Sequence, residues 1–265
     1  MDTLQLNQLF SISGKTALVT GGSRGIGLMI AQAYIANGVK VYISSRKVEV
    51  CEAVEAELSK HGECIAIPAN LATAEGQATL VNAIKEREEK LDILVNNAGA
   101  AWGAPLDEFP ESGYDRTMDI NVKGLFMLTR DLLPLLDKAA TKQNPARVIN
   151  IGSIDGLTVP SMDNFPYAAS KAAVHHLTRV LAVHLMDRYI TVNAIAPGLF
   201  PSQMTRFVFT SDEGQQRIEE NYPLGRAGSP EDMAALAIYL ASPGAAYLNG
   251  AVIPLDGGIS LANRQ

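Results

Sequence analysis

Short apolar runs alternate along the chain with longer segments in which apolar residues recur at helical spacing. The runs have the aliphatic and β-branched character of buried strands and lie at 16–19, 39–45, 64–67, 92–99, 146–153, 190–196 and 251–255. The first of the helices expected between them ends at Asn37, and the others span about 48–60, 75–89, 114–138, 167–187 and 230–241. Strands that alternate with helices predict a parallel sheet covered on both faces.

Three features interrupt this alternation. Residues 1–13 are expected to form an N-terminal arm, and residues from about 199 to 222 a loop over the substrate, with two short helices at about 203–221. Pro134 is expected to bend or end the helix at 114–138, because proline lacks a backbone N–H and clashes with the preceding turn.

The first strand ends in a cluster of glycines. The stretch from Lys15 to Gly27 reads KTALVTGGSRGIG, and its glycines remove side chains where the backbone turns sharply into a helix. The free N–H groups and the dipole of a helix N-terminus favour a pyrophosphate at this position. With the strand that follows, the pattern predicts an α/β fold of the Rossmann type, a doubly wound parallel sheet of about seven strands.

Length and composition fit one such domain over 1–265, since the chain has 265 residues of which 47% are hydrophobic. The formal net charge of −6 argues against a nucleic-acid partner or an anionic membrane surface. Cys51 and Cys64 have no metal-ligand spacing, so we expect no metal and a reducing compartment. No secretory pattern opens the chain and no apolar stretch is long enough for a membrane span, so we expect a cytoplasmic protein.

Reactive side chains fall at the expected strand ends. Ser153 ends the fifth strand, and Tyr167 and Lys171 share a face of the next helix because they are four residues apart. An ammonium beside the phenol is expected to lower the tyrosine pKa from about 10, and an oxidised nicotinamide would act in the same direction. Tyr167 would then supply a proton to a carbonyl polarised by Ser153. Asn121 is expected to hold a water that links Lys171 to solvent.

Several sequence motifs resemble those of the short-chain dehydrogenase/reductase family: TGGSRGIG, NNAG, YAASK, the PG at Pro197 and the DGG at Asp256. The resemblance implies a catalytic tetrad of Asn121, Ser153, Tyr167 and Lys171, and gives Lys171 the nicotinamide ribose as a second partner. It implies the following cofactor-binding residues: Gly21, Ser23, Arg24, Gly25, Ile26, Gly27, Ser45, Arg46, Asn70, Leu71, Asn97, Ala98, Gly99, Tyr167, Lys171, Pro197, Gly198, Phe200 and Ser202.

The chain departs from the family pattern at several positions. Ser202 stands where the family usually has threonine, and Asn70 where most relatives carry an aspartate beside the adenine. Both residues keep a hydrogen-bonding group, so we expect binding to persist. Asp155 has two open interpretations, recognition of a polar substrate group and capping of a turn.

The cofactor is expected to be NADPH. Enzymes that use NAD place an acidic residue at the end of the second strand, whereas this chain has Ser44, Ser45 and Arg46. Arg24 approaches the same point from the glycine turn, and two guanidiniums match a phosphate dianion. The alternative is that both arginines are solvated surface residues.

The substrate is less constrained. The stretches NNAGAAWGAPL, NPARVINIGS and APGLFPSQMTR resemble bacterial 3-oxoacyl reductases, particularly the branch of rhamnolipid producers, which implies a ketone or an acyl thioester, either free or bound to a carrier protein. An apolar substrate wall is expected from Trp102, Phe200, Met204, Phe207 and Phe209. Two alternatives stay open: a sugar or polyol dehydrogenase of the same family, and a catalytically silent nucleotide-binding regulator.

Two helices carry more apolar surface than one core contact needs. The helices at 114–138 and 167–187 are apolar on more than one face, which indicates burial against another subunit. Because relatives are mostly tetramers built on these helices, we expect a homotetramer. His175, His176 and His184 on the second helix are expected to serve packing or the interface.

Overall fold

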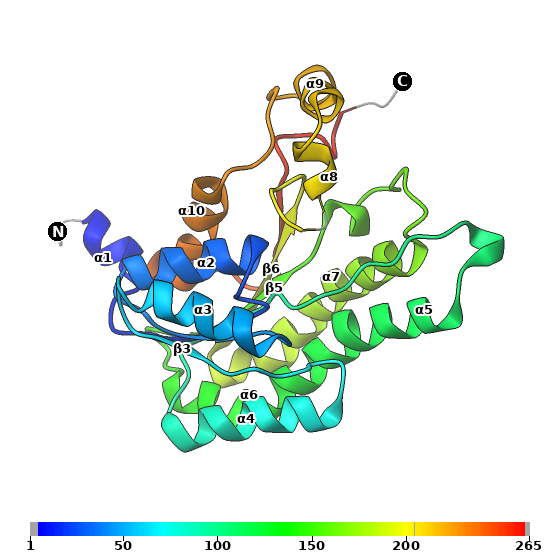
Figure 1. The fold of residues 1–265 in the computed structure, drawn as a ribbon. Helices are drawn as coiled ribbons and strands as arrows, with labels where there is room; N and C mark the ends of the chain where they lie inside the picture. Colours follow the sequence, from blue (N-terminus) through cyan, green and yellow to red (C-terminus); the bar gives the residue numbers. More distant parts are fainter. Residues whose placement is uncertain (1–4, 204, 263–265) are drawn as a thin grey trace.

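The computed structural model describes residues 5–203 and 205–262 and, among them, all but the side chain of Phe207. A seven-stranded parallel sheet runs through the molecule in the order β3-β2-β1-β4-β5-β6-β7 (Figure 1). Its strands are β1 (Thr16–Thr20), β2 (Lys40–Ser44), β3 (Cys64–Ala66), β4 (Ile93–Asn96), β5 (Ala146–Ile151), β6 (Ile190–Pro197) and β7 (Val252–Leu255). Since all pairs are parallel, the C-terminal ends of the strands meet at one edge.

Helices cover both faces of the sheet. One layer consists of α2 (Gly25–Ala36), α3 (Val48–Leu58) and α10 (Pro230–Ala241), and the other of α4 (Ala74–Arg87), α6 (Leu125–Ala139) and α7 (Phe165–Leu185). The short helix α5 (Glu111–Met118) lies beside α7. The fold class predicted from the sequence, a doubly wound parallel sheet of about seven strands, is confirmed.

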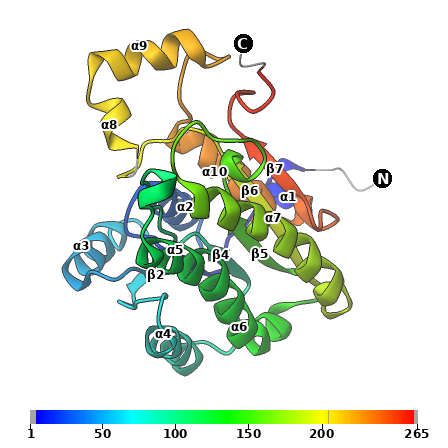
Figure 2. The same ribbon diagram turned by 90° about the vertical axis from the view of Figure 1, so that its right-hand side faces the viewer.

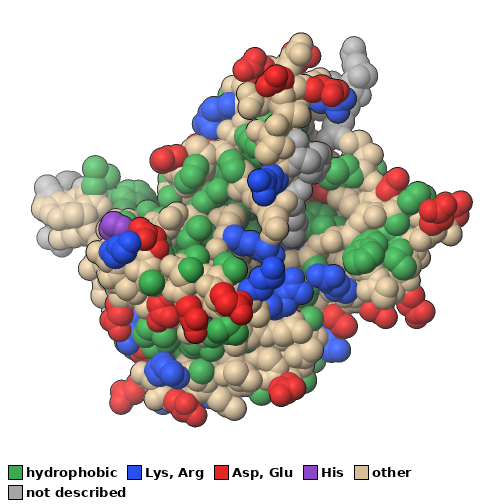
Figure 3. All heavy atoms as spheres, viewed as in Figure 1, with side chains coloured by type: hydrophobic (Ala, Val, Ile, Leu, Met, Phe, Trp, Pro, Cys, Tyr) green, Lys and Arg blue, Asp and Glu red, His purple; other side chains and the backbone are tan. Residues whose placement is uncertain are grey.

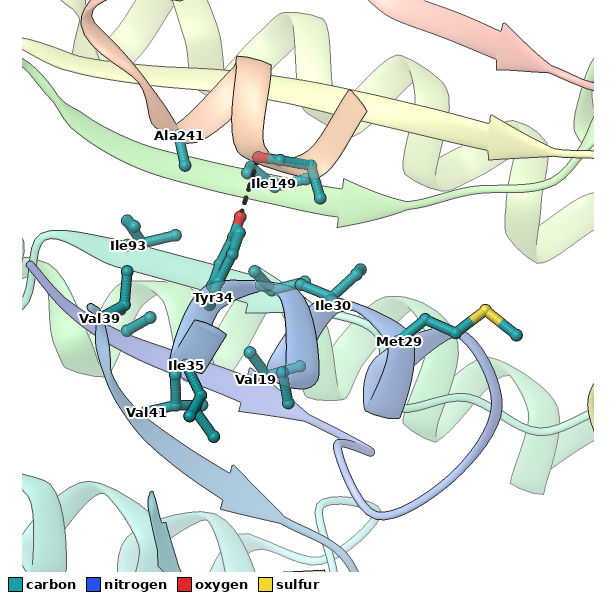
Figure 4. Packing of buried hydrophobic residues seen from close by; sticks show 14 of the residues in the cluster. Val19, Met29, Ile30, Tyr34, Ile35, Val39, Val41, Ile93, Ile149 and Ala241 are labelled. Atoms are coloured by element: carbon teal, nitrogen blue, oxygen red, sulfur yellow. Dashed lines mark hydrogen bonds between the residues drawn. The ribbon is translucent and has the colours of Figure 1, made fainter. Parts of the chain in front are cut away.

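Each face of the sheet has its own apolar core. On the side of α2 and α10, the ring of Tyr34 is fully buried and its hydroxyl donates to the carbonyl of Ala237 at 3.1 Å, which joins the two helices (Figure 4). On the other side, α4 and α6 bury leucines such as Leu80 and Leu132 against β4 and β5. The buried strands are apolar on both faces for this reason.

A row of polar side chains crosses the second core. Asn96 of β4 lies opposite Asn150 of β5, and the Asn96 amide donates to the Asn150 side-chain oxygen and to the Thr129 hydroxyl, both at 3.0 Å. Asn150 in turn donates to the hydroxyl of Thr178 on α7 at 2.9 Å. All four residues are buried, so the row ties α6, the sheet and α7 together through buried hydrogen bonds.

The helix expected at 114–138 is helical throughout, and it differs from the expectation by a π-helical turn inside it. The backbone forms α5, then a π-helical turn at Asp119–Gly124, then α6, which continues through Pro134 to Ala139. The turn widens where Asn121 bonds the backbone of Ala100 and where Gly124 packs on the carbonyl of Leu71. Burial of the leucines on both sides of Pro134 keeps α6 helical there.

Short helices near the N-terminus and after β6 complete the fold. The expected N-terminal arm contains a helix, α1 (Leu6–Phe10), whose Phe10 ring lies 6.2 Å from the ring of Tyr239. The two short helices expected in the loop are α8 (Arg206–Phe209) and α9 (Asp212–Asn221). Figures 1 and 2 show them standing beyond the C-terminal ends of the strands, apart from the main body.

Candidate active site

The glycine turn and the end of β4 are bonded to each other through Thr20. Its hydroxyl accepts from the backbone N–H groups of Asn97 at 2.9 Å and Ala98 at 3.0 Å. The Asn97 amide donates back to the Thr20 carbonyl at 2.8 Å. The two motifs therefore form one rigid unit at the C-terminal edge of the sheet.

Two glycines of the turn leave no room for a side chain. A Cβ at Gly21 would lie 2.7 Å from the Asn97 amide nitrogen, and one at Gly27 would lie 2.4 Å from the same atom. Gly21 and Gly25 also have φ values of 66° and 53°, in the region that favours glycine. The turn keeps the backbone close to β4 and leads directly into α2, which begins at Gly25.

The residues expected around the adenosine phosphate surround the start of α2. Ser23 is buried and Ile26 half-buried, whereas Arg24 and Arg46 are exposed. The hydroxyl of Ser45 lies 3.0 Å from the Sγ of Cys51. Figure 3 shows Lys and Arg side chains gathered near the centre of the face of the molecule that Figure 1 also presents. The structure thus places a local positive region on an acidic protein.

Asn70 and Leu71 lie in the turn before α4. The Asn70 side chain is exposed, and its oxygen accepts from the N–H of Ala72 at 3.3 Å. Leu71 is buried and lines a small cavity together with Ala98, which brings the β3 and β4 ends to one place.

The segment after β6 joins the site through its backbone. Gly198 donates to the carbonyl of Leu255 at 2.9 Å, which holds the end of β6 beside β7. Ser202 lies against Gly25, where a Cβ would be 3.2 Å from the serine Cβ, and Arg24 donates to the side-chain oxygen of Gln203. The loop therefore contacts the glycine turn.

Phe200 is a correction to the expected substrate wall. Its side chain is only 2% exposed and packs in the core with Met233 and Met29, and Gly228 lies against its ring. The apolar ring is buried on the α10 side, so it faces the protein interior. Trp102 is 38% exposed and packs on Gly113, and Phe209 is half-buried. Met204 and the side chain of Phe207 lie outside the described residues.

Sequence reasoning missed Thr205. Its hydroxyl lies 3.0 Å from that of Ser202 and donates to the carbonyl of Phe200 at 2.6 Å. A hydroxyl three residues beyond Ser202 is the available signal in the sequence. Thr205 fixes the conformation of the loop, and its hydroxyl is a hydrogen-bond partner of the Ser202 hydroxyl in this structure.

Ser153 and Tyr167 meet where β5 ends and α7 begins. Their side chains share a hydrogen bond, and the Nζ of Lys171 lies 5.4 Å from the centre of the Tyr167 ring. Burial raises the pKa of Tyr167 to about 12, against a smaller lowering by the Ser153 hydrogen bond and with a further raising by Asp155. The sequence-based expectation of a lowered tyrosine pKa is therefore wrong, because burial acts in the opposite direction.

Lys171 is buried inside the site. Its Nζ donates to the carbonyl of Ile151 at 2.8 Å, at the end of β5. Burial lowers the pKa of Lys171 to about 8, while the carboxylate of Asp155 acts in the opposite direction. The ammonium is thus held under the Tyr167 ring by a backbone carbonyl.

The side chain of Asn121 bonds to Ala100 and to Ser170, the residue before Lys171. Its amide donates to the Ala100 carbonyl and to the Ser170 hydroxyl, both at 2.9 Å, and its oxygen accepts from the Ala100 N–H at 2.8 Å. Ser170 donates to the carbonyl of Tyr167 at 2.7 Å. The side chain therefore connects the π-helical turn to α7 and to the end of the NNAG motif.

His175 lies directly behind Ser153. Its Nε2 accepts from the N–H of Ser153 at 3.4 Å, and a Cβ at Gly152 would come within 2.1 Å of the same atom. Burial lowers the pKa of His175 to about 4, so the ring is neutral near pH 7. The expected packing role becomes specific, because the ring supports the loop that carries Ser153.

Known proteins with this arrangement are found by sequence and by structure. Residues 21–260 match the family model described as "Enoyl-(Acyl carrier protein) reductase". The "Rhamnolipids biosynthesis 3-oxoacyl-[acyl-carrier-protein] reductase" of Pseudomonas aeruginosa is 48% identical over 256 residues, which cover 97% of this chain and 100% of that protein. A 3-oxoacyl-[acyl-carrier-protein] reductase of Synechocystis is 35% identical over 94% of this chain and 98% of its own length.

A solved structure is also similar over nearly the whole chain. The "Pseudomonas aeruginosa RhlG/NADP active-site complex" has a TM-score of 0.93 and 48% sequence identity, and the match covers 96% of this chain and 99% of that one. Within the part of the chain that the structure describes, no helix is both long and apolar enough to cross a membrane.

Proposed function

Because the chain belongs to the short-chain dehydrogenase/reductase family, we propose that it reduces the ketone of a 3-oxoacyl thioester with NADPH. The observation that carries the proposal is the contact of Ser153, Tyr167 and Lys171 at one strand end. The relative of P. aeruginosa, named as a 3-oxoacyl-[acyl-carrier-protein] reductase, supports the substrate class. The similar RhlG/NADP complex of P. aeruginosa supports the cofactor.

The residues present fit a dinucleotide. Gly21 and Gly27 leave a turn free of side chains in front of the N-terminus of α2, which suits a pyrophosphate. The exposed guanidiniums of Arg24 and Arg46 flank this turn and the end of β2, where no carboxylate follows Ser44. A 2′-phosphate is therefore favoured over a free ribose hydroxyl pair.

In the proposed reaction the protein handles the proton. The hydride for the carbonyl carbon comes from bound NADPH. Ser153 donates a hydrogen bond to the carbonyl oxygen, and the Tyr167 hydroxyl gives its proton to the developing alkoxide. Since burial raises its pKa, Tyr167 is protonated near pH 7, which favours carbonyl reduction over alcohol oxidation. The Lys171 ammonium stabilises the phenolate that remains.

The proposal is tested by a substrate comparison at fixed NADPH. We expect kcat/KM for 3-oxoacyl thioesters, presented on coenzyme A and on a carrier protein, to exceed that for ketohexoses by about tenfold to two-hundredfold. The measurement is the rate of NADPH consumption. Preference for the sugars would support the polyol dehydrogenase instead. No consumption with any substrate would support the silent regulator.

We further propose that one domain, spanning 1–265, forms a cytoplasmic homotetramer in which 199–222 cover the substrate. Exposed apolar residues on α7 support the assembly, because Val180 and Val183 are 38% and 60% exposed. We expect Val183→Glu to dissociate the tetramer in light scattering at micromolar concentration. Val159→Glu, at an 88% exposed site between β5 and α7, is the matched control and should keep the tetramer mass. A monomeric wild-type protein would reject the assembly.

A further inference from the structure

Asp155 lies at the contact between the segments that carry Ser153 and Tyr167. Ser153 is the N-cap of a 3-10 turn at Ile154–Gly156, and its hydroxyl accepts from the N–H of Asp155 at 3.1 Å. The same turn packs on α7 so closely that a Cβ at Gly156 would lie 2.6 Å from the backbone of Lys171 and Ala172. Asp155 is thus fixed at the helix turn that holds the lysine.

The carboxylate of Asp155 is also anchored from the other side. It accepts from the side-chain amide of Asn164 at 2.9 Å, and Asn164 is the buried residue that precedes α7. Asn164 is itself held by its carbonyl, which accepts from the N–H of Ala168 at 3.1 Å. The hydrogen bond therefore links the turn after Ser153 to the start of the helix that carries Tyr167.

The remaining groups around the phenol are neutral or lie on α7 itself. Ser153 faces it from the segment after β5, and Asn121 and Ser170 lie where the π-helical turn meets α7. On α7, His175 is neutral near pH 7, and the positive charge of Arg179 contributes to lowering the pKa of His175. Asp155 is then the negative charge that faces Tyr167 and Lys171 from another element, and it raises the pKa of both.

We propose that Asp155 is a positioning residue whose carboxylate, held by Asn164, places a fixed negative charge beside Tyr167 and Lys171 and keeps the proton on the phenol. The inference rests on the proposed reaction. It adds a reason for the direction of that reaction, since a proton kept on Tyr167 is available for carbonyl reduction. The turn is capped by Ser153, whose hydroxyl accepts from the Asp155 N–H, and the proposal does not include recognition of a polar substrate group by Asp155.

The test is the pH profile of kcat for alcohol oxidation with NADP⁺, which needs a deprotonated Tyr167. Asp155→Asn keeps an oxygen for Asn164 and removes the charge, so both groups lose their protons more readily. We expect the rising limb to move to lower pH by about 0.5 to 1 unit, and the oxidation rate below the limb to rise about threefold to tenfold. Asn164→Ala frees the carboxylate to turn toward solvent and should give a smaller shift in the same direction.

The control is Asp163→Asn, which removes the same charge from an exposed site next to Asn164 and should leave the limb unmoved. Thermal unfolding checks that each variant is folded, and Asn164→Ala carries the test if Asp155→Asn is not. An unmoved or upward limb in a folded variant, with wild-type enzyme active, overturns the role of Asp155. An inactive wild-type enzyme overturns the proposed function instead.

Discussion

Replacing Tyr167 with phenylalanine is expected to lower kcat for ketone reduction by about 100-fold to 10,000-fold. The substitution keeps the ring that lies over Lys171 and removes the hydroxyl that shares a hydrogen bond with Ser153. Affinity for NADPH should change little, because the ring keeps its place in α7. The measurement is single-turnover reduction together with a binding titration of NADPH.

Tyr189→Phe is the matched control, since its hydroxyl is on an exposed residue directly before β6, at the N-terminal edge of the sheet and opposite the candidate site. It should retain wild-type turnover. Lys171→Met should harm both turnover and cofactor binding, because the ammonium has two assigned partners. If Tyr167→Phe keeps more than about a tenth of the wild-type rate, which is well above the range for loss of a general acid, then Tyr167 is not the acid.

Reversal of the cofactor preference is the second large effect. The double variant Ser45→Asp with Arg46→Ile places a carboxylate at the end of β2 and removes one guanidinium. A charge-assisted hydrogen bond contributes about 1.5 to 3 kcal/mol, so the loss of one weakens NADPH by roughly tenfold to a hundredfold. The new carboxylate repels the 2′-phosphate and accepts from ribose hydroxyls, so NADH should become the better cofactor.

The comparison is kcat/KM for NADPH and NADH in the wild type, the double variant and a control. Arg87→Ile on α4 is a suitable control, because it removes an exposed guanidinium whose recorded partner is the Ala83 carbonyl of its own helix. It should leave the ratio of the two cofactors unchanged. Equal use of both cofactors by the wild-type protein contradicts the assignment of Arg24 and Arg46.

The arrangement of the sheet was predictable because buried parallel strands are apolar on both faces and are separated by helices of regular period. The π-helical turn within the helix at 114–138 was not predictable, because the helical periodicity of the sequence continues across it. That turn depends on the bonds of Asn121 to Ala100, a contact between residues far apart in the sequence. Pro134 was expected to bend or end the helix. Instead α6 continues through it, because packing of its neighbours outweighs the lost hydrogen bond.

The candidate site was predictable as a set of neighbours but not as an electrostatic environment. A spacing of four residues is enough to place Lys171 beside Tyr167. It says nothing about how much water is removed from the phenol, and burial decides the direction of its pKa shift. The prediction that Phe200 lines the substrate wall was wrong for a similar reason, because a loop sequence does not tell whether an aromatic ring faces the cleft or the core.

The amide row between β4 and β5 has a consequence for the assembly of the sheet. Asn96 pairs with Asn150 in register, and both bond to threonines on the helices of one face. A shift of the β4–β5 register by one residue would turn an asparagine toward the apolar core of α2 and α10, where its side-chain amide would lack a hydrogen-bond partner. Misaligned pairing of these two central strands is therefore penalised more than their aliphatic neighbours alone would penalise it.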